Sequence, residues 1–354
     1  MPNDKKSAVD VIKFRPIQVW LQIILMIITA GVIAYSMYHA TTFFTSSDSL
    51  PKLQKFTPQS LEHFGGNSSI ISTGMYIKNF VAFDPIKNDF IFNGVVWFEY
   101  DPEVVTLLML SKFAFERAEI LEKSEPDLRN IGGKFFAEYT VRVRFKNFLS
   151  YSYFPFDDHR VNIQLINTFL VPSESIFESN QASLVVDASV SALGWNRVNQ
   201  YVQNGFIEIG IKEERSINNI YYPSVVYSID YMRIGVRYAL TILLPLLAIF
   251  FVTLLAFSVN VITNSMLAIT LSTGGVTATI AYRFVIENFS PAVGYFMVSD
   301  YIYFLFLFLV SIVFIIANIM PKLVYVQKLL LLITLHCMIS GAIMYLLFYY
   351  VGSL

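Results

Sequence analysis

The sequence predicts an α+β membrane protein, with an extracytoplasmic antiparallel β-sandwich followed by a four-helix transmembrane bundle and with an extra N-terminal transmembrane helix. Three observations predict this fold class. Only 14% of the 354 residues are charged, where about 25% is usual for a soluble protein. No Asp, Glu, Lys or Arg lies between Arg237 and Arg283. Most of the polar sequence forms one block with strand-like patterns, between the first and second apolar segments.

The helices are predicted from the length of the apolar segments. A helix that crosses the hydrocarbon core of a membrane needs about 20 apolar residues. Five segments meet this requirement, at roughly residues 17 to 39, 236 to 259, 264 to 287, 300 to 320 and 329 to 351. The last four of them form a predicted transmembrane domain over residues 234 to 354.

We interpret the first apolar segment as a retained anchor over residues 17 to 40, after a cytoplasmic tail of residues 1 to 16. Basic residues precede it, as they do in a signal peptide. The apolar run, which reaches about His39, is longer than a signal core, and no small-x-small cleavage pattern lies near Ala40. A signal peptide is the alternative interpretation of this segment.

The orientation follows from Lys and Arg near the ends of the segments, because these residues collect on the cytoplasmic side. The N-terminal tail is basic, and the link between the fourth and fifth segments carries Lys322 and Lys328 without an acid. Both are therefore expected in the cytoplasm. Residues 41 to 233 and the link with Glu287 and Asp300 are then extracytoplasmic.

The polar block is predicted to form strands. Apolar and basic residues alternate over residues 141 to 146, a period of two that is typical of a half-buried strand. Similar runs occupy residues 91 to 100, 160 to 166, 206 to 212 and 225 to 232, and the turn signals are Asp84-Pro85, Asn93-Gly94, Gly132-Gly133 and Asn218-Asn219. Such short strands favour an antiparallel sandwich. Residues 107 to 123 fit either one surface helix or two irregular strands.

Composition excludes several classes of function. The net charge of −1 provides no basic surface for a nucleic-acid partner. The only cysteine, Cys337, lies in the last apolar segment, so the polar block has no disulfide. The four histidines are scattered and none has the spacing of metal ligands, so we expect no metal site and no cofactor. No catalytic constellation is found, and an enzyme is not predicted.

The segment at residues 264 to 287 is rich in small and hydroxylated residues, unlike its neighbours. Thr263, Thr270, Thr277 and Phe284 recur every seven residues, which keeps them near one helical face. A hydroxyl stripe of this kind can line a water-filled pore. The candidate pore-lining residues are Thr263, Thr270, Gly274, Thr277, Ala281, Phe284 and Glu287.

Helix packing is the alternative explanation of the small residues. Gly274 with Ala278, and Gly275 with Thr279, have the small-xxx-small spacing of close helix contacts in membranes. At the outer end of the segment, Glu287 either pairs with Arg283 on the helix surface or contributes to a charged ring at a mouth.

The order of these parts resembles the pentameric ligand-gated ion channels, the Cys-loop receptor family, and in particular its bacterial members. Four local matches support the resemblance. Phe154-Pro155-Phe156-Asp157 is similar to the family's signature loop, and Leu193-Gly194-Trp195 is similar to its tryptophan strand. Arg233 resembles the arginine that ends the last strand, Pro245 resembles the proline of the first channel helix, and Pro291 with Tyr295 resembles the link after the pore helix. The resemblance covers about residues 70 to 354.

Four features depart from the family pattern. No cysteine pair closes the loop around Phe154, as is usual for bacterial members, and the stretch of residues 101 to 153 is short. Asn260, Asn264 and Met266 occupy the inner end of the pore helix, where cation-selective relatives place glutamate. Thr277 stands where many relatives have a bulky apolar gate, which leaves Phe284 as an outer constriction.

The resemblance implies a homopentamer in the bacterial inner membrane, with the β domain in the periplasm or outside and the N-terminus in the cytoplasm. It implies an inorganic ion as the permeant species and an unidentified small ligand, or a proton, as the activator between neighbouring sandwiches. The residues expected to couple the sandwich to the pore are Lys87, Pro155, Phe156, Asp157, Arg233, Pro291 and Tyr295. Asp157 and Arg233 are expected to pair, or else are two unrelated charges.

Aromatic side chains are the only candidates for a ligand pocket. Aromatic faces can hold cationic ligands, and the candidates are Trp195, Tyr221 and Tyr222; core packing is the alternative. The alternative function is a non-conducting membrane sensor with an extracytoplasmic ligand-binding domain. A transporter is less consistent with segments that lack mid-membrane charges.

Overall fold

The computed structural model describes residues 16–187, 192, 194–213 and 216–351, which form two compact units. The helical unit comprises the described residues of Met1–Thr45, Tyr151–Asp157 and Gly235–Leu354. The β unit comprises those of Ser46–Ser150 and Asp158–Ile234. The chain is therefore of the α+β type. The predicted tail, residues 1 to 16, lies outside the described residues except for Pro16.

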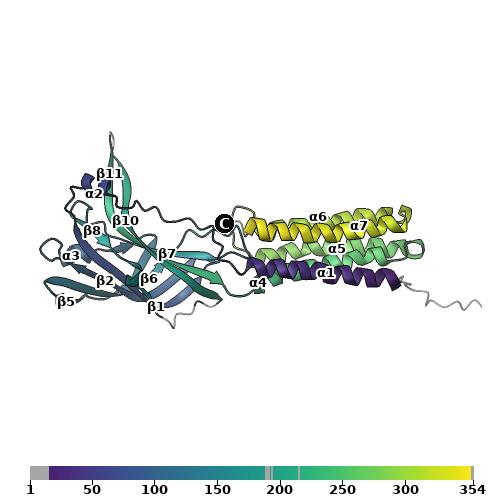
Figure 1. Ribbon diagram of the computed structural model, residues 1–354, viewed down its shortest axis with the longest axis horizontal. Helices are drawn as coiled ribbons and strands as arrows, with labels where there is room; N and C mark the ends of the chain where they lie inside the picture. Colours follow the sequence, from purple (N-terminus) through teal and green to yellow (C-terminus); the bar gives the residue numbers. More distant parts are fainter. Residues whose placement is uncertain (1–15, 188–191, 193, 214–215, 352–354) are drawn as a thin grey trace, which may run out of the picture. The chain divides into compact units, whose positions relative to one another are not determined.

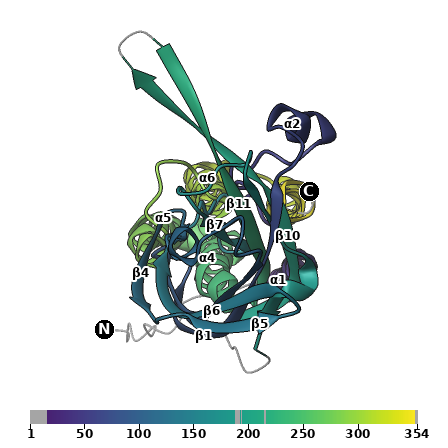
Figure 2. The same ribbon diagram turned by 90° about the vertical axis from the view of Figure 1, so that its left-hand side faces the viewer.

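The β unit contains two sheets (Figure 1). The first has the strand order β4(Ala118–Lys123), β6(Lys134–Phe145), β2(Asp89–Tyr100), β1(Ser69–Asp84), β8(Ser175–Glu178), with β5(Asp127–Ile131) on β6 and β9(Leu184–Val186) on β1. The second has the order β10(Trp195–Glu213), β11(Ser216–Arg233), β7(His159–Ile166), β3(Ala114–Phe115). The hairpin of β10 and β11 extends well beyond the rest of its sheet (Figure 2). Short helices α2(Pro58–His63), α3(Leu107–Leu110) and η1(Gln181–Ser183) complete the unit.

The two sheets share one hydrophobic core, and the predicted alternation of the strands explains it. Every second residue of β2 is buried, from Phe90 to Tyr100. In β6 the apolar residues of the predicted stretch, such as Val143, are buried, and the basic residues between them, such as Arg144, reach solvent. β7 and β11 of the other sheet bury residues such as Ile163 and Tyr227 in the same core. The strand predictions for this block are confirmed.

The first sheet is mixed and not purely antiparallel. β8 and β9 both run parallel to β1, whereas the other pairs are antiparallel. A parallel pair requires a long connection between its strands. Here most of the β unit separates β1 from β8, so neighbouring turn signals could not predict the direction.

Two of the four predicted turns are wrong. Asn93-Gly94 lies inside β2. A side chain at position 94 would overlap the Tyr76 carbonyl of β1, so glycine at this position allows the backbones of the two strands to come close. Asn218-Asn219 lies inside β11, where both residues pair with β10. The turns at Asp84-Pro85 and Gly132-Gly133 are confirmed, and both glycines of the latter have positive φ.

Residues 107 to 123 follow the second of the two predicted alternatives. A single helical turn, α3, is followed by the short strand β3 and by β4. Phe113 and Phe115 are buried and fix these irregular strands to the core.

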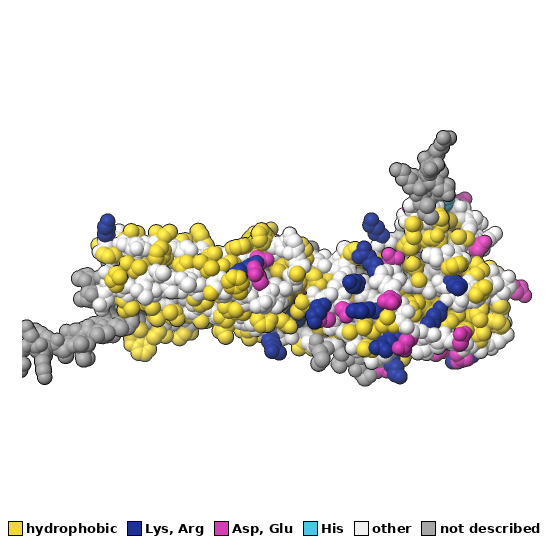
Figure 3. All heavy atoms as spheres, turned by 180° about the vertical axis from the view of Figure 1, so that it is seen from behind, with side chains coloured by type: hydrophobic (Ala, Val, Ile, Leu, Met, Phe, Trp, Pro, Cys, Tyr) yellow, Lys and Arg dark blue, Asp and Glu magenta, His cyan; other side chains and the backbone are white. Residues whose placement is uncertain are grey.

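The helical unit contains five helices that are long and apolar enough to cross a membrane. They are α1(Pro16–Ala40), α4(Arg237–Leu254), α5(Val261–Phe289), α6(Val298–Ile319) and α7(Tyr325–Tyr345), with the short turns η2(Leu255–Ser258), η3(Met320–Lys322) and η4(Leu346–Val351). They lie side by side (Figure 1), and their outer surface is mostly hydrophobic (Figure 3). These properties are consistent with an integral membrane protein, as predicted.

Helix α1 packs against its neighbours through a polar seam. Gln22, Thr29 and Ser36 recur every seven residues, and all three are buried. The Thr29 hydroxyl lies 2.7 Å from Nδ1 of His336 in α7, and the Ser258 hydroxyl donates to the Gln22 side chain. Polar groups inside an apolar bundle are stabilised by such hydrogen bonds. The seam therefore fixes the rotation of α1 in the bundle.

Stability of the β unit is expected to depend weakly on one surface ion pair. Two hydrogen bonds of 2.7 and 3.0 Å from Arg144 hold the pKa of Asp89 below its usual value. A lowered pKa stabilises the fold above the pKa of the unfolded state, and this stabilisation is lost as the pH falls through the folded value. Asp89→Asn should therefore lower the free energy of unfolding at pH 7 and leave it unchanged near pH 2. The effect at pH 7 should be small, because both side chains of the pair reach solvent. Denaturant titrations of both proteins at the two pH values measure this difference; an equal difference at both would contradict it.

Candidate pore helix and coupling loop

One face of α5 is exposed, and it carries the residues that the sequence predicted for it. Thr270, Gly274, Thr277, Ala281, Phe284 and Glu287 are all exposed. Phe284 is the most exposed large apolar side chain in the outer half of the helix, at 69%. The side chain of Thr263 lies outside the described part of the structure. Six of the seven predicted side chains therefore lie on the solvent-accessible face of the single chain.

The hydroxyl groups on this face are not all satisfied within the chain. Threonine in a helix commonly donates to the carbonyl one turn before it. Thr270 does so at 2.8 Å, as does the buried Thr279 of the opposite face at 2.9 Å. Within the described residues, the hydroxyls of Thr273 and Thr277 have no hydrogen-bond partner. A hydroxyl without a partner is costly in hydrocarbon and cheap in water.

The opposite face of α5 packs against α4 and α6. Its buried residues include Ala268, Ser272, Gly275 and Thr279. The two small-xxx-small pairs are thus separated: Gly275 and Thr279 lie on the packed face, and Gly274 and Ala278 lie on the exposed one. Packing explains only the first pair.

Two adjacent glycines provide a matched test of this assignment. A methyl group at Gly275 would overlap the side chain of Thr253 in α4, whereas nothing lies within 4 Å of the corresponding position at Gly274. Gly275→Ala should therefore destabilise the helical unit by about 2 kcal/mol, and Gly274→Ala should be neutral or stabilise it by about 0.5 kcal/mol. Thermal unfolding of the detergent-solubilised variants measures both, and equal melting temperatures would contradict the assignment.

Charges at the outer end of α5 are paired within the chain. Nε of Arg283 lies 2.9 Å from Oε1 of Glu287, and Nη1 lies 2.5 Å from Oδ1 of Asp300. Asp300 also accepts the backbone N–H of Met297 at 2.8 Å and so begins α6. Arg283 therefore links α5 to α6, and the predicted Arg283–Glu287 pair is present. Glu287 keeps about half of its side chain exposed, at 54%.

The signature loop belongs to the helical unit. Residues Tyr151–Asp157, which we call the coupling loop, pack with the helices although β6 and β7 flank them in the chain. Three hydrogen bonds connect the loop to the link between α5 and α6: the Tyr151 N–H donates to the Tyr295 hydroxyl at 2.9 Å, the Val298 N–H to the Ser152 carbonyl at 3.0 Å, and the Ser299 N–H to the Phe154 carbonyl at 3.0 Å. Of the predicted coupling residues, only Tyr295 takes part in these three hydrogen bonds; its partner Tyr151 belongs to the same loop as the predicted Pro155, Phe156 and Asp157.

The apolar part of the coupling loop is buried as well. Pro155, Phe156 and Asp157 are all buried. Phe154 is fully buried, with its ring 6.3 Å from that of Tyr238 at the start of α4. Tyr238 in turn lies 6.5 Å from Phe289 at the end of α5. The loop therefore contacts α4 as well as the link.

The remaining coupling candidates lie in the β unit. Arg233 ends β11, with its guanidinium carbon 4.4 Å from the Trp195 ring centre, and its backbone N–H donates to Asp158 at 2.8 Å. Lys87 is exposed in the turn between β1 and β2 and lies 3.5 Å from Asp84. The side-chain pairing of Asp157 with Arg233 stays a prediction.

A buried carboxylate that sequence reasoning missed holds both ends of the coupling loop. Asp48 accepts the backbone N–H of Ser150 and that of Arg160, both at 2.7 Å, and lies 3.3 Å from Nδ1 of His159. Its side chain is only 1% exposed. Asp48 belongs to the strap, which we define as residues 46 to 54 and which ends at Gln54, paired with Phe206 of β10 in both directions. A single acid in an irregular segment gave no signal in the sequence.

The aromatic ligand candidates do not come together in one chain. Trp195 is buried in the core, pairs in register with Arg233, and contacts the His159 ring at 5.4 Å. Tyr221 pairs with a position about 13 residues further along β10, which corresponds to roughly 40 Å of strand. Leu193 of the tryptophan motif lies outside the described residues. Trp195 therefore packs in the core, and Tyr221 and Tyr222 lie near the far end of the hairpin.

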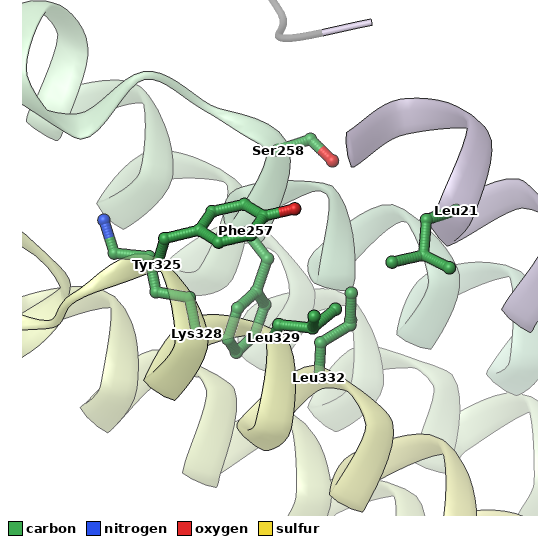
Figure 4. Close-up of a pocket in the computed structure, with 7 residues that line it drawn as sticks. All are labelled: Leu21, Phe257, Ser258, Tyr325, Lys328, Leu329 and Leu332. Carbon is green, nitrogen blue, oxygen red and sulfur yellow. The ribbon is translucent and has the colours of Figure 1, made fainter. Parts of the chain in front are cut away.

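The helical unit contains a small cavity between α1, η2 and α7. Leu21, Ser258, Tyr325 and Leu332 are among its lining residues (Figure 4). Its volume of about 20 Å³ accommodates one water molecule and excludes a larger ligand. Two larger open grooves, of about 1040 and 950 Å³, lie on the β unit.

Among the described residues, no group of three His, Cys, Asp or Glu side chains could hold a metal ion. No protein-family profile matches the chain, and no curated protein sequence matches it.

Proposed function

We propose that the protein is a ligand-gated or proton-gated ion channel, in which several copies of α5 surround a water-filled pore. The exposed face of α5 is the observation that carries this proposal. It combines small residues with the hydroxyls of Thr273 and Thr277, which have no partner among the described residues. A pore would supply water to these groups, whereas lipid would not.

Five subunits follow from the resemblance to the pentameric channels. One α5 encloses no space, so a pore requires a ring of copies. The two sheets with a common core are consistent with the β-sandwich of that family, and the four helices α4 to α7 with its channel domain. The protein would be an integral protein of the bacterial inner membrane, with its sandwich outside the cytoplasm and an inorganic ion as the permeant species.

The coupling loop would transmit the state of the sandwich to the pore. It lies between β6 and β7 in the chain, and its hydrogen bonds reach the link that ends α5 and begins α6. A displacement of the strands would therefore move this link, and with it the outer end of α5, where Phe284 lies. An activator would favour the open arrangement only by its higher affinity for it. A pair of Asp157 and Arg233 would strengthen the same junction.

The test does not require the activator. A ring of Phe284 side chains would form an apolar constriction, which excludes ions because it dewets. Phe284→Ser should wet this constriction and give a several-fold higher ion flux from liposomes without any ligand. Val285→Ser is the matched control, since Val285 is the adjacent residue, is 37% exposed and points about 100° away around the helix. A leak that is absent from both variants, or equal in both, would favour a non-conducting sensor.

A further inference from the structure

The second groove of the β unit lies between the strap and the sheets. The strap lines one side with residues 49 to 54, and it is attached at both ends, at Asp48 and at Gln54. The other walls come from β10, from β7 and from the segments around Arg117 and Phe148. The volume of about 950 Å³ is ample for a small organic molecule.

Three cations line this groove without an ion-pair partner. They are Lys52, Arg117 and Lys146, and none forms an ion pair with any described residue. Other arginines of the β unit do form ion pairs, for example Arg144 with Asp89 at 2.7 Å and Arg160 with Asp230 at 2.6 Å. The lining therefore carries three cations against two carboxylates, Glu116 and Glu208, and has an excess of positive charge.

The guanidinium of Arg117 is already fixed at the groove. Its central carbon lies 3.2 Å from the centre of the Phe148 ring, and the residue has a positive φ of 55°. Such a backbone conformation is uncommon for a residue with a side chain and often marks a functional position. Since the stacking holds the group in place, an anion that binds it would lose less side-chain entropy on binding.

The rest of the lining favours a ligand that has an apolar body and a single negative charge. Leu53, Phe206 and Ile207 provide apolar surface. Of the two acidic residues, Glu208 accepts a hydrogen bond from Gln54 at 2.8 Å, and Glu116 is exposed. These carboxylates would repel a multiply charged anion more strongly than a monoanion.

We infer that this groove is a binding site for a small organic carboxylate with an apolar body. The carboxylate would lie between Arg117 and Lys146, which are charge-assisted donors, and the apolar body would lie against Leu53 and Phe206. The strap, which has both ends attached, forms one wall of the groove. Tyr221 and Tyr222 border this site, since they pair with Glu208 and Ile207 of β10, and the Tyr221 ring lies 5.7 Å from that of Phe206. The site needs no second subunit.

Benzoate is a suitable probe, titrated into the full chain in detergent at constant ionic strength and followed by calorimetry. We expect saturable binding with a dissociation constant on the order of 1 mM, as for a ligand of its size. Arg117→Gln and Lys146→Gln should each weaken binding about tenfold, the loss of one charge-assisted hydrogen bond. Benzyl alcohol, which lacks the carboxylate, and inorganic phosphate should bind at least about tenfold more weakly.

Lys134→Gln is the matched control, since Lys134 is an exposed β-unit cation that lies outside the groove and 3.5 Å from Glu99. It should bind benzoate like the wild type. Lys52→Gln, in the exposed part of the strap, provides a third groove variant in case Arg117→Gln fails to fold. The proposal is overturned by the absence of saturable benzoate binding, by equal affinities in the groove variants and the control, or by equal binding of benzyl alcohol. Because the readout is binding, its outcome does not depend on whether the protein conducts ions.

Discussion

A cysteine at position 277 is expected to react with a charged, membrane-impermeant thiol reagent at least about tenfold faster than a cysteine at position 279. The reactive species is the thiolate, which requires water around the sulfur. Thr277 lies on the exposed face of α5, whereas Thr279 is fully buried and donates to the Gly275 carbonyl. If the exposed face of α5 lines a pore, water reaches only the first position.

The experiment uses a Cys337→Ser background, because Cys337 is the only native cysteine and is exposed. Modification is measured by intact mass after reconstitution into liposomes. Ile280→Cys serves as a second test position, since Ile280 is 51% exposed and lies about 60° from Thr277 around the helix, on the same exposed face. Equal, slow reaction of all three cysteines would place the exposed face of α5 in lipid and contradict the pore.

Replacing Asp48 with alanine is expected to destabilise the β unit by about 3 kcal/mol. The substitution leaves the N–H groups of Ser150 and Arg160 and the ring of His159 without their buried acceptor, and such losses are costly. For a unit of this size the melting temperature should fall by roughly 10 °C. The fluorescence of Trp97 and Trp195, both in the β unit, reports its unfolding in the full chain.

Asp127→Ala is the matched control for this prediction. Asp127 also pairs with a basic residue, Arg129 at 2.8 Å, but its side chain is 64% exposed. An exposed pair of this kind contributes about 0.5 kcal/mol, so the control should melt close to the wild type. Similar melting temperatures for the Asp48 and Asp127 variants would show that the strap does not hold the ends of the coupling loop.

The fold was predictable wherever the signal is local. The strands of residues 91 to 100 and 141 to 145 follow from an alternation that a half-buried sheet imposes on its own sequence. The five apolar helices follow from length and hydrophobicity alone. The turn at Asn93-Gly94 was wrong because a glycine also permits the close approach of a neighbouring strand, and the sequence cannot distinguish the two uses. The parallel pairing of β8 and β9 with β1 depends on contacts between residues about 100 positions apart.

The contrast between local signals and contacts of distant residues also decides which parts of the candidate site could be predicted. The exposed face of α5 was predictable, because the helical period determines which residues share a face before any partner is known. The contact of Tyr295 with the coupling loop was anticipated only through the resemblance, not from any local pattern. Asp48 was missed because its importance arises from three partners more than 100 residues away. The groove around Arg117 was missed for the same reason, since its walls are brought together only by the fold.

The number of chains in the purified particle tests the central proposal most directly, since a pore lined by α5 requires a ring of copies. Native mass spectrometry of the protein released from mild detergents counts chains of 40.4 kDa, and the intact chain mass is read in the same experiment. The account predicts five chains in each particle. A monomer or dimer that persists across several mild detergents would contradict it.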